Sequence, residues 1–439
     1  MPGLRVDSQI ARELNRTVVF DLLRTRRIIS RVDLARESGL SKATISEIVD
    51  QFIQEGFVRT LGPAQTARGR RPVLLEFEPR ARLAIGVEFS PTGCTAVLTD
   101  LNGEVVRLLA APTRLASADD ALDTAIDLIA DLVKGMREDG SPGPGGLIGI
   151  GVGAPGMIDP RDGTIQNAPS LGWRSIPVGP RLASRFSVPV VVVNHAKAAA
   201  LGEAWCGAGR QVDNLAYLLI GPGAASGIVI DGHLYRGISL SEGEIAHVTV
   251  LPDGPLCHCG NRGCLRALAS TSAILSQVRE QLRARGESRP LLEHALDEDV
   301  DPLALEEVGR LAAVGDPLVT DVLGDVARYI GIAAANLVNI LNPEMLVLGG
   351  TVIHSLPTLL PAVEAEIRRR AVPISAANLA VVPARLEHEA VPVGAAAYLL
   401  SEISVVGFSS VRPLSLRAAG SIRPRSAFSH LGTPGAPDA

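Results

Sequence analysis

Residues 30–56 read SRVDLARESGLSKATISEIVDQFIQEG, and this stretch predicts two short helices joined by a tight turn. Ser30 and Ser41 each precede a run of helical periodicity and are of the residue type that caps helix N-termini. Gly39 supplies the tight turn, and Gly56 ends the second helix. A helix, a glycine turn and a serine-capped helix at this spacing are typical of helix-turn-helix domains.

The flanking sequence completes a small domain that we expect over residues 1–78. Residues 10–27 have helical periodicity, and their expected apolar stripe consists of Ile10, Leu14, Val18, Leu22 and Leu23. Residues 57–60 and 73–77 are strand-like and enclose a glycine-containing loop with three arginines, Arg68, Arg70 and Arg71. Such a loop is typical of a basic wing that follows the DNA backbone or enters a minor groove.

The distribution of charge favours nucleic acid as the partner of this head. Residues 1–72 hold 13 Arg or Lys and 8 Asp or Glu, whereas the remaining chain holds 29 basic and 39 acidic residues. A basic head on an acidic body suits contact with phosphates. The side chains expected to face DNA, besides the wing arginines, are Ser41, Lys42, Ala43, Thr44, Ser46 and Glu47. The alternative is a three-helix bundle that docks another protein.

Composition indicates a globular chain of two or three domains. Hydrophobic residues make up 46% and charged residues 20% of the 439 residues, and no run of 18 uninterrupted apolar residues occurs. The N-terminus does not resemble a signal peptide, so we expect a cytoplasmic protein without a membrane helix. The five cysteines are an odd number with three of them at 257, 259 and 264, which indicates metal ligation rather than a disulfide framework. Cys94 and Cys206 are expected to be small buried residues.

Residues 79–400 alternate between strand-like and helical stretches, which predicts an α/β body of two lobes with a cleft between them. A helix is expected over residues 118–136. The expected strands lie at 83–89, 95–100, 104–109, 147–152, 188–193, 215–220, 227–230 and 346–348. Residues 401–439 are rich in Ser, Pro, Gly and Arg, and we expect a disordered tail that makes at most an accessory contact with DNA or a partner.

Six stretches of the body carry a specific resemblance. They read IGVGAPGMID at 150–159, LGW at 171–173, AAALGE at 198–203, GEIAH at 243–247, CHCGNRGC at 257–264 and NPE at 342–344, the last followed by a Gly-Gly pair at 349–350. In this order they resemble the ROK family, meaning repressors, open reading frames and sugar kinases. The head is similar to that of the family's regulators. The resemblance implies a winged helix-turn-helix domain followed by a two-lobed actin-like, ribonuclease H-like sugar kinase fold.

The resemblance also implies a structural zinc site in the loop 247–264. Its expected ligands are one imidazole and three thiolates, from His247, Cys257, Cys259 and Cys264. Because all four positions would be filled by the protein, the metal would stabilise the fold and would not activate water. His258 lies between two ligands, and we expect it to be exposed.

The family's sugar-binding positions fall on Asn194, His195, Glu244, His247 and Arg266. Two of these depart from the family pattern, because His195 stands where the family has an aspartate and Arg266 where it has a glutamate. A pocket with these replacements could accept an anionic ligand such as a sugar phosphate. The alternative is a decayed pocket in which Arg266 pairs with Glu244.

The same departures predict that the body has no catalytic residues. A sugar kinase needs a carboxylate to take the proton of the attacking hydroxyl, and His195 replaces it. The first phosphate loop reads EFSPTG at 88–93, where the bulk of Phe89 and the rigidity of Pro91 are expected to prevent a close approach of phosphate. The second loop carries Pro222 in place of a hydroxyl residue.

Together these features predict a sequence-specific repressor that binds a double-stranded DNA operator as a homodimer or homotetramer. A sugar or sugar phosphate in the inactive kinase-like body would control operator binding. Two alternatives stay open: an active sugar kinase with an accessory head, and a DNA-binding regulator that responds to no ligand.

Overall fold

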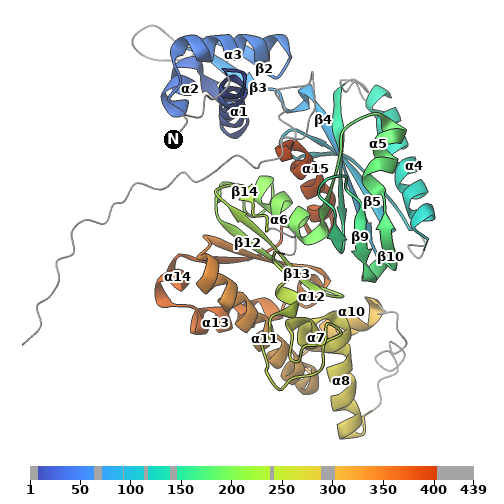
Figure 1. Cartoon of the computed structure of the whole chain (residues 1–439). Helices are drawn as coiled ribbons and strands as arrows, with labels where there is room; N and C mark the ends of the chain where they lie inside the picture. Colours follow the sequence, from blue (N-terminus) through green and yellow to red (C-terminus); the bar gives the residue numbers. More distant parts are fainter. Residues whose placement is uncertain are drawn as a thin grey trace, which may run out of the picture.

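The computed structural model contains a small head and two α/β lobes (Figure 1). It describes residues 8–63, 72–91, 93–112, 117–138, 146–237, 242–287 and 302–402. The predicted wing arginines, Arg68, Arg70 and Arg71, lie outside the described residues. The same holds for residues 403–439 of the expected tail.

The head contains the two helices that the opening stretch predicts. Its elements are α1 (Ser8–Arg26), β1 (Ile28–Ser30), α2 (Arg31–Ser38), α3 (Lys42–Gln54), β2 (Val58–Pro63) and β3 (Val73–Phe77), and the strand order is β1-β3-β2. The Ser30 and Ser41 hydroxyls each accept a hydrogen bond of 3.1 Å from the backbone N–H three residues later. Gly39 ends α2 with φ of 71°, which is the left-handed region that favours glycine. Both predicted helices are confirmed.

The predicted apolar stripe of α1 is wrong at two positions. Leu14 and Val18 are 59% and 45% exposed. The helix instead buries the face that carries Phe20, whose ring lies edge-on to three others at centroid distances of 5.3–6.0 Å: Phe52, Phe57 and Phe77. Helical spacing allows either face to be buried, and the aromatic contacts from distant segments decide between them.

Lobe 1 is built on a five-stranded sheet with the order β11-β7-β4-β5-β6. Its strands are β4 (Leu83–Ser90), β5 (Gly93–Asp100), β6 (Val105–Ala111), β7 (Leu147–Ala154) and β11 (Val190–Asn194). Strands β4, β7 and β11 run parallel, so their carboxyl ends share one edge of the sheet. Helices α4 (Ala118–Glu138) and α5 (Val178–Phe186) cover one face, and α15 (Ala390–Glu402) covers the other (Figure 1). A small sheet beside it contains β8 (Met157–Ile158), β9 (Ile165–Ala168) and β10 (Trp173–Ile176).

Lobe 2 contains a second five-stranded sheet, with the order β14-β13-β12-β15-β16. Its strands are β12 (Leu215–Ile220), β13 (Ala224–Ile230), β14 (His233–Leu234), β15 (Met345–Gly349) and β16 (Ala380–Pro383). Its helices are α7 (Leu265–Ala269), α8 (Thr271–Arg285), α10 (Pro302–Ala313), α11 (Pro317–Leu341), α12 (Thr351–Ser355), α13 (Leu359–Arg370) and α14 (Pro373–Asn378). The predicted α/β body of two lobes is confirmed.

None of the described helices has the length and apolar character needed to cross a membrane.

The chain crosses between the lobes twice, and the two crossing segments are held together by helix packing and by hydrogen bonds to one carboxylate. Helix α6 (His195–Trp205) leads from β11 toward β12, and residues 384–389 lead from β16 to α15. The helices α6 and α15 pack so closely that a Cβ atom at Gly394 would lie 1.7 Å from the carbonyl oxygen of Ala198. The buried Glu203 carboxylate accepts backbone hydrogen bonds of 2.7–2.9 Å from Ala208 beyond α6 and from Arg385 and Leu386 in the second crossing.

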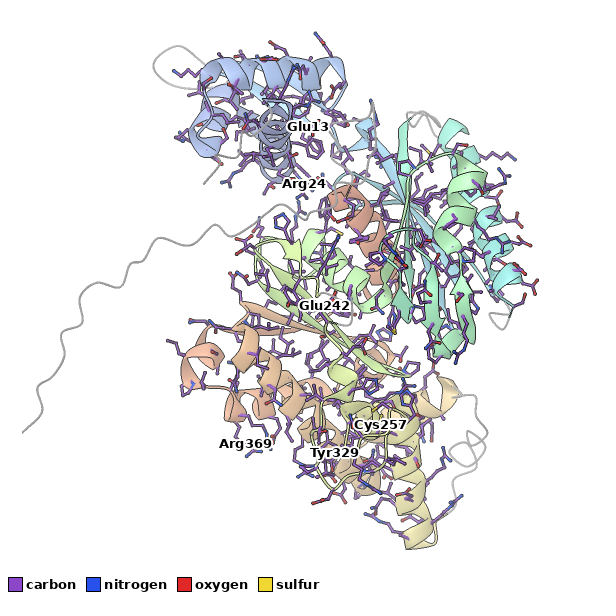
Figure 2. All side chains as sticks on the ribbon, viewed as in Figure 1. Glu13, Arg24, Glu242, Cys257, Tyr329 and Arg369 are labelled. Atoms are coloured by element: carbon purple, nitrogen blue, oxygen red, sulfur yellow. The ribbon has the colours of Figure 1, made fainter. Side chains whose placement is uncertain are left out.

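The head and the body share one hydrophobic cluster. Head residues such as Leu23 and Phe77 belong to the same core as Ala396, Leu399 and Leu400 of α15. The Arg24 side chain of α1 lies at this junction (Figure 2). Its guanidinium is 3.9 Å from the ring centroid of Trp205, the last residue of α6. Burial lowers the pKa of Arg24, and the nearby Asp21 partly offsets the effect. The head is therefore seated on the end of the helix that crosses between the lobes.

Candidate functional site

The predicted DNA-facing residues lie on the first turns of α3. Ser41, Lys42, Ala43 and Glu47 are exposed, whereas Thr44 and Ser46 are half-buried. The Ser41 and Thr44 hydroxyls lie 2.9 Å apart, so both side chains are engaged at the cap. Glu47 forms an exposed ion pair of 2.7 Å with Arg12 of α1.

Arg31 of α2 fixes the position of α3 and was not among the predicted site residues. Its guanidinium donates to the Ser46 carbonyl at 3.3 Å and to the Asp50 carboxylate at 2.6 Å. This contact holds the two helices of the motif together. The sequence shows Arg31 only as a basic residue directly after the Ser30 cap, and nothing in that position indicates Ser46 and Asp50 as its partners.

The four predicted metal ligands come together in lobe 2. The ligand atoms of His247, Cys257, Cys259 and Cys264 all lie within 4.8 Å of one another. His247 Nδ1 is 3.8 Å from Cys257 Sγ, and the Cys259 and Cys264 sulfurs are 3.7 Å apart. His258 is exposed, and its Nδ1 lies 3.5 Å from Cys257 Sγ.

The surroundings of this quartet fit a tetrahedral metal ion. Gly263 has φ of 62°, and a Cβ atom there would lie 1.5 Å from the Leu251 carbonyl oxygen, so the loop closes only with glycine. Burial and the neighbouring thiols raise the pKa of Cys264 to about 12. Three thiols in contact need a cation to become thiolates together, and zinc prefers this set of one nitrogen and three sulfurs.

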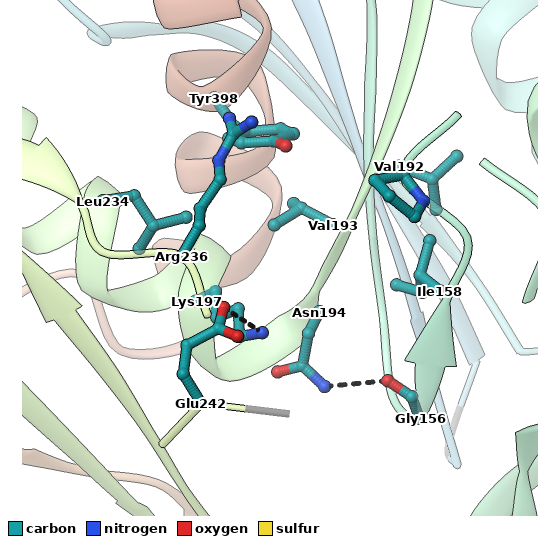
Figure 3. Close-up of a pocket in the computed structure, with 11 residues that line it drawn as sticks. Gly156, Ile158, Val192, Val193, Asn194, Lys197, Leu234, Arg236, Glu242 and Tyr398 are labelled. Carbon is teal, nitrogen blue, oxygen red and sulfur yellow. Dashed lines mark hydrogen bonds and ion pairs between the residues drawn. The ribbon is translucent and has the colours of Figure 1, made fainter. Parts of the chain in front are cut away.

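A small hollow lies between the lobes, at the start of α6 (Figure 3). The Asn194 side chain caps α6 by accepting a hydrogen bond of 3.0 Å from Ala196 N, and it donates one of 3.1 Å to the Gly156 carbonyl. Lys197 and Glu242 form an ion pair of 2.6 Å, with side chains only 10% and 8% exposed. These groups give the hollow polar walls from both lobes.

Arg236 and Tyr398 complete the polar lining of the hollow. The Arg236 guanidinium lies 5.1 Å from the centroid of the Tyr398 ring, and it also pairs with Glu402. Sequence reasoning missed Lys197, Arg236 and Glu242. Lys197 carried a signal, because it is one of three lysines in the chain and stands among alanines, whereas the other two residues carried none.

Of the predicted ligand-binding residues, only Asn194 lines this hollow. His195 follows it in α6, and its ring forms a hydrogen bond with the backbone of Ala154, while its Nδ1 has no hydrogen-bond partner among the described residues. Burial lowers the pKa of His195 to about 4, so the imidazole is neutral near pH 7. His195 therefore supplies no positive charge for an anionic ligand.

The remaining predicted ligand-binding residues lie in lobe 2, on elements near the β12–β13 turn and the metal loop. Glu244 is exposed, and His247 is one of the four metal-ligand candidates. Arg266 lies close to the β12–β13 turn, since a Cβ atom at Gly223 would be 3.7 Å from its guanidinium. Within the described part of the chain Arg266 has no ion pair, so the pair with Glu244 that the alternative of a decayed pocket named is not formed there.

The expectation that the bulk of Phe89 obstructs the first phosphate loop is wrong. Phe89 is 1% exposed, and its ring packs edge-on against Trp173 at 5.2 Å, inside lobe 1. Alternation along β4 points Phe89 to the core and directs Glu88 to the opposite face. Burial raises the pKa of Glu88 to about 7.

The raised pKa of Glu88 makes the stability of the chain pH-dependent. Since the folded state holds this proton up to about pH 7 and the unfolded state releases it near pH 4.5, the contribution of Glu88 is lost as pH rises between these values. We expect Glu88→Gln to stabilise the chain at pH 8 by about 3 kcal/mol relative to wild type and to have little effect at pH 4.5. Thermal unfolding across this range measures the effect. Glu306→Gln, an exposed substitution in α10, is the control. If Glu88→Gln raised the stability equally at both pH values, the raised pKa of Glu88 would be contradicted.

Known proteins are similar to this chain both in the body and over nearly its whole length. The ROK family model matches residues 84–402. The chain is 32% identical over 394 residues to the xylose repressor of Caldicellulosiruptor bescii, which covers 90% of this chain and 97% of the relative. A solved ROK family transcriptional regulator, a homologue of the E. coli MLC protein, is similar over 89% of this chain and 96% of its own, with 29% identity and a TM-score of 0.75.

A kinase is also among the similar structures. The ROK family glucokinase of Streptomyces griseus, in complex with glucose and AMPPNP, matches 72% of this chain and 98% of its own at 30% identity, with a TM-score of 0.60. The predicted fold, a sugar kinase body behind an additional N-terminal domain, is thereby confirmed. Since the family model spans most of the chain and the xylose repressor matches nine-tenths of it, this chain belongs to the ROK family.

Proposed function

We propose that this chain is a sugar-responsive transcriptional repressor whose operator affinity depends on a sugar or sugar phosphate bound between the lobes. The observation that carries the proposal is the path of α6. The helix begins with Asn194 as its cap in the hollow and ends at Trp205, on which Arg24 of the head is stacked. A similar protein named xylose repressor supports a sugar as the ligand class.

The coupling between ligand binding and operator binding follows from the rigidity of α6 and from its position between the lobes. A ligand that binds Asn194 together with lobe 2 groups such as Glu242 favours one spacing of the lobes. Any rotation of α6 that accompanies this change moves Trp205 and therefore the seat of α1. In a dimer on a two-fold operator, a small change in the separation of the two heads is enough to alter affinity.

The DNA contact is proposed for the first turn of α3, and Lys42 tests it. We expect Lys42→Ala to weaken operator binding about three- to tenfold and to reduce the slope of log affinity against log salt concentration by about one, as the loss of one phosphate contact requires. Fluorescence anisotropy at several salt concentrations measures both values. Lys134→Ala removes the same charge from an exposed site on α4 of lobe 1 and should change neither. An unchanged salt slope for Lys42→Ala would place the DNA interface elsewhere.

We further propose that the body has no kinase activity. His195 is neutral and partly enclosed where the family's kinases have an aspartate, and a neutral imidazole does not orient the attacking hydroxyl as a carboxylate does. A coupled ATP assay with glucose, xylose, mannose and N-acetylglucosamine tests this. Turnover comparable to that of the family's kinases would support the rival function of an active enzyme.

Zinc is the metal that we propose for the quartet of His247, Cys257, Cys259 and Cys264. With four protein ligands, it would hold the loop between β14 and α7 in place and would take no part in chemistry. The chain would work in the cytoplasm, where its operator DNA is accessible.

A further inference from the structure

Three side chains of metal-ligating types, separate from the cysteine quartet, gather on the surface where α12 of lobe 2 meets the second crossing. His354 belongs to α12, and Glu387 and His388 belong to the short 3-10 helix η5 (Glu387–Glu389). One ligand atom from each lies within 4.8 Å of the other two, and all three residues are exposed. His354 Nδ1 is 3.9 Å from a Glu387 carboxylate oxygen, and the two imidazole rings meet at a centroid distance of 5.3 Å.

We propose that His354, Glu387 and His388 form a second metal site, which takes a first-row divalent transition metal such as Zn²⁺. Bonds of about 2.0–2.2 Å from zinc to nitrogen and oxygen put tetrahedral ligand atoms about 3.3–3.6 Å apart. The present separations of up to 4.8 Å exceed this by at most about 1.5 Å, and rotation of exposed side chains closes such a difference. The site therefore needs no movement of the backbone.

The ligand set selects the class of metal. Two imidazoles and one carboxylate suit Zn²⁺, Ni²⁺ and Cu²⁺, whereas Mg²⁺ and Ca²⁺ prefer sites made of oxygen. Because the side chains are exposed, with that of His354 at 53%, water completes the coordination. The site would thus be open and exchangeable, unlike the closed quartet around Cys264.

The backbone of η5 presents adjacent residues to the same ion. Glu387 has φ of 47°, a strained conformation that non-glycine residues rarely adopt. Neighbouring side chains normally point in different directions, but here both Glu387 and His388 reach His354. A bound metal offsets the cost of this turn by using all three side chains together.

The site lies on the second crossing between the lobes. Glu387 directly follows Leu386, whose backbone N–H is bound by the Glu203 carboxylate, and α15 begins at Ala390. A metal there would fasten α12 of lobe 2 to the segment that leads back into lobe 1. Metal occupancy would therefore stabilise the connection on which lobe movement depends.

Calorimetric titration of the tag-free full-length chain, first loaded with one equivalent of zinc to fill the cysteine quartet, tests the site. We expect one additional Zn²⁺ per chain for wild type, and at least tenfold weaker binding of it in His354→Ala and in His388→Ala, since each loses one ligand. His233→Ala, an exposed histidine outside both clusters, should bind the second zinc like wild type.

Cobalt absorption gives an independent measurement of the same site. The second equivalent of Co²⁺ should add weak visible bands without the intense sulfur-to-cobalt absorption of the first. All three histidine variants should keep the wild-type melting temperature, because the changed side chains are exposed. Binding of only one zinc by wild type, or a second zinc retained at full affinity by His354→Ala, would overturn the proposal.

Discussion

Replacing Cys264 by serine is expected to eliminate metal binding at the cysteine quartet, to unfold the metal loop and the helices beside it, and to abolish operator binding. Structural zinc contributes about 10–16 kcal/mol in small zinc domains, which is comparable to the whole stability of a typical domain at about 5–15 kcal/mol. Cys264 is fully buried and directly precedes Leu265, which lies in the lobe 2 core. Loss of the ion therefore reaches the core as well as the loop.

Metal content by mass spectrometry, thermal unfolding and operator affinity together measure this effect. Cys206→Ser is the matched control, because Cys206 is half-buried, lies outside the quartet and has its sulfur 3.6–3.7 Å from two backbone carbonyl oxygens. It should keep its metal and its affinity. A Cys264→Ser chain that melts at the wild-type temperature would show that the quartet has no structural role.

Replacing Arg24 by alanine is expected to separate operator binding from the sugar response. Allosteric couplings typically amount to about 1–3 kcal/mol, or roughly a 5- to 150-fold change in affinity. The stacking of Arg24 on Trp205 is worth about 0.5–2 kcal/mol and joins the head to the end of α6. Without it, we expect the ratio of operator affinities with and without the effector to fall most of the way to one, while the chain stays folded.

The ratio is measured by titrating operator DNA in the presence and absence of each sugar in a neutral and phosphorylated panel. Arg26→Ala is the control, because Arg26 carries the same charge on the same helix but pairs with Glu37 inside the head at 3.0 Å. It should change absolute affinity at most and leave the ratio intact. A wild-type ratio in Arg24→Ala would exclude this junction as the coupling route.

Features that depend on neighbours along the chain were predictable from the sequence. Ser30, Gly39 and Ser41 set helix ends through contacts within three residues, and the spacing of Cys257, Cys259 and Cys264 determines a compact metal loop. These patterns, with the six ordered stretches, were enough to predict the two lobes and the head.

Features that depend on distant contacts were not predictable. The face of α1 that is buried follows from Phe20 meeting rings from α3 and β3, which periodicity alone does not reveal. The polar walls of the hollow come from Lys197, Arg236 and Glu242, which lie on separate segments that only the folded lobes bring together. The sequence suggested that His195 adds positive charge to the ligand pocket, but burial lowers its pKa and leaves the imidazole neutral.

Helix α15 sets a constraint on how this protein is made. It is the last described element, yet it covers the lobe 1 sheet and gives Ala396, Leu399 and Leu400 to the core of the head. On the ribosome, the head and lobe 1 are therefore synthesised long before their cores can be completed. A premature stop near residue 389 would remove only a short piece of the chain, but it would leave the first domain made without its support.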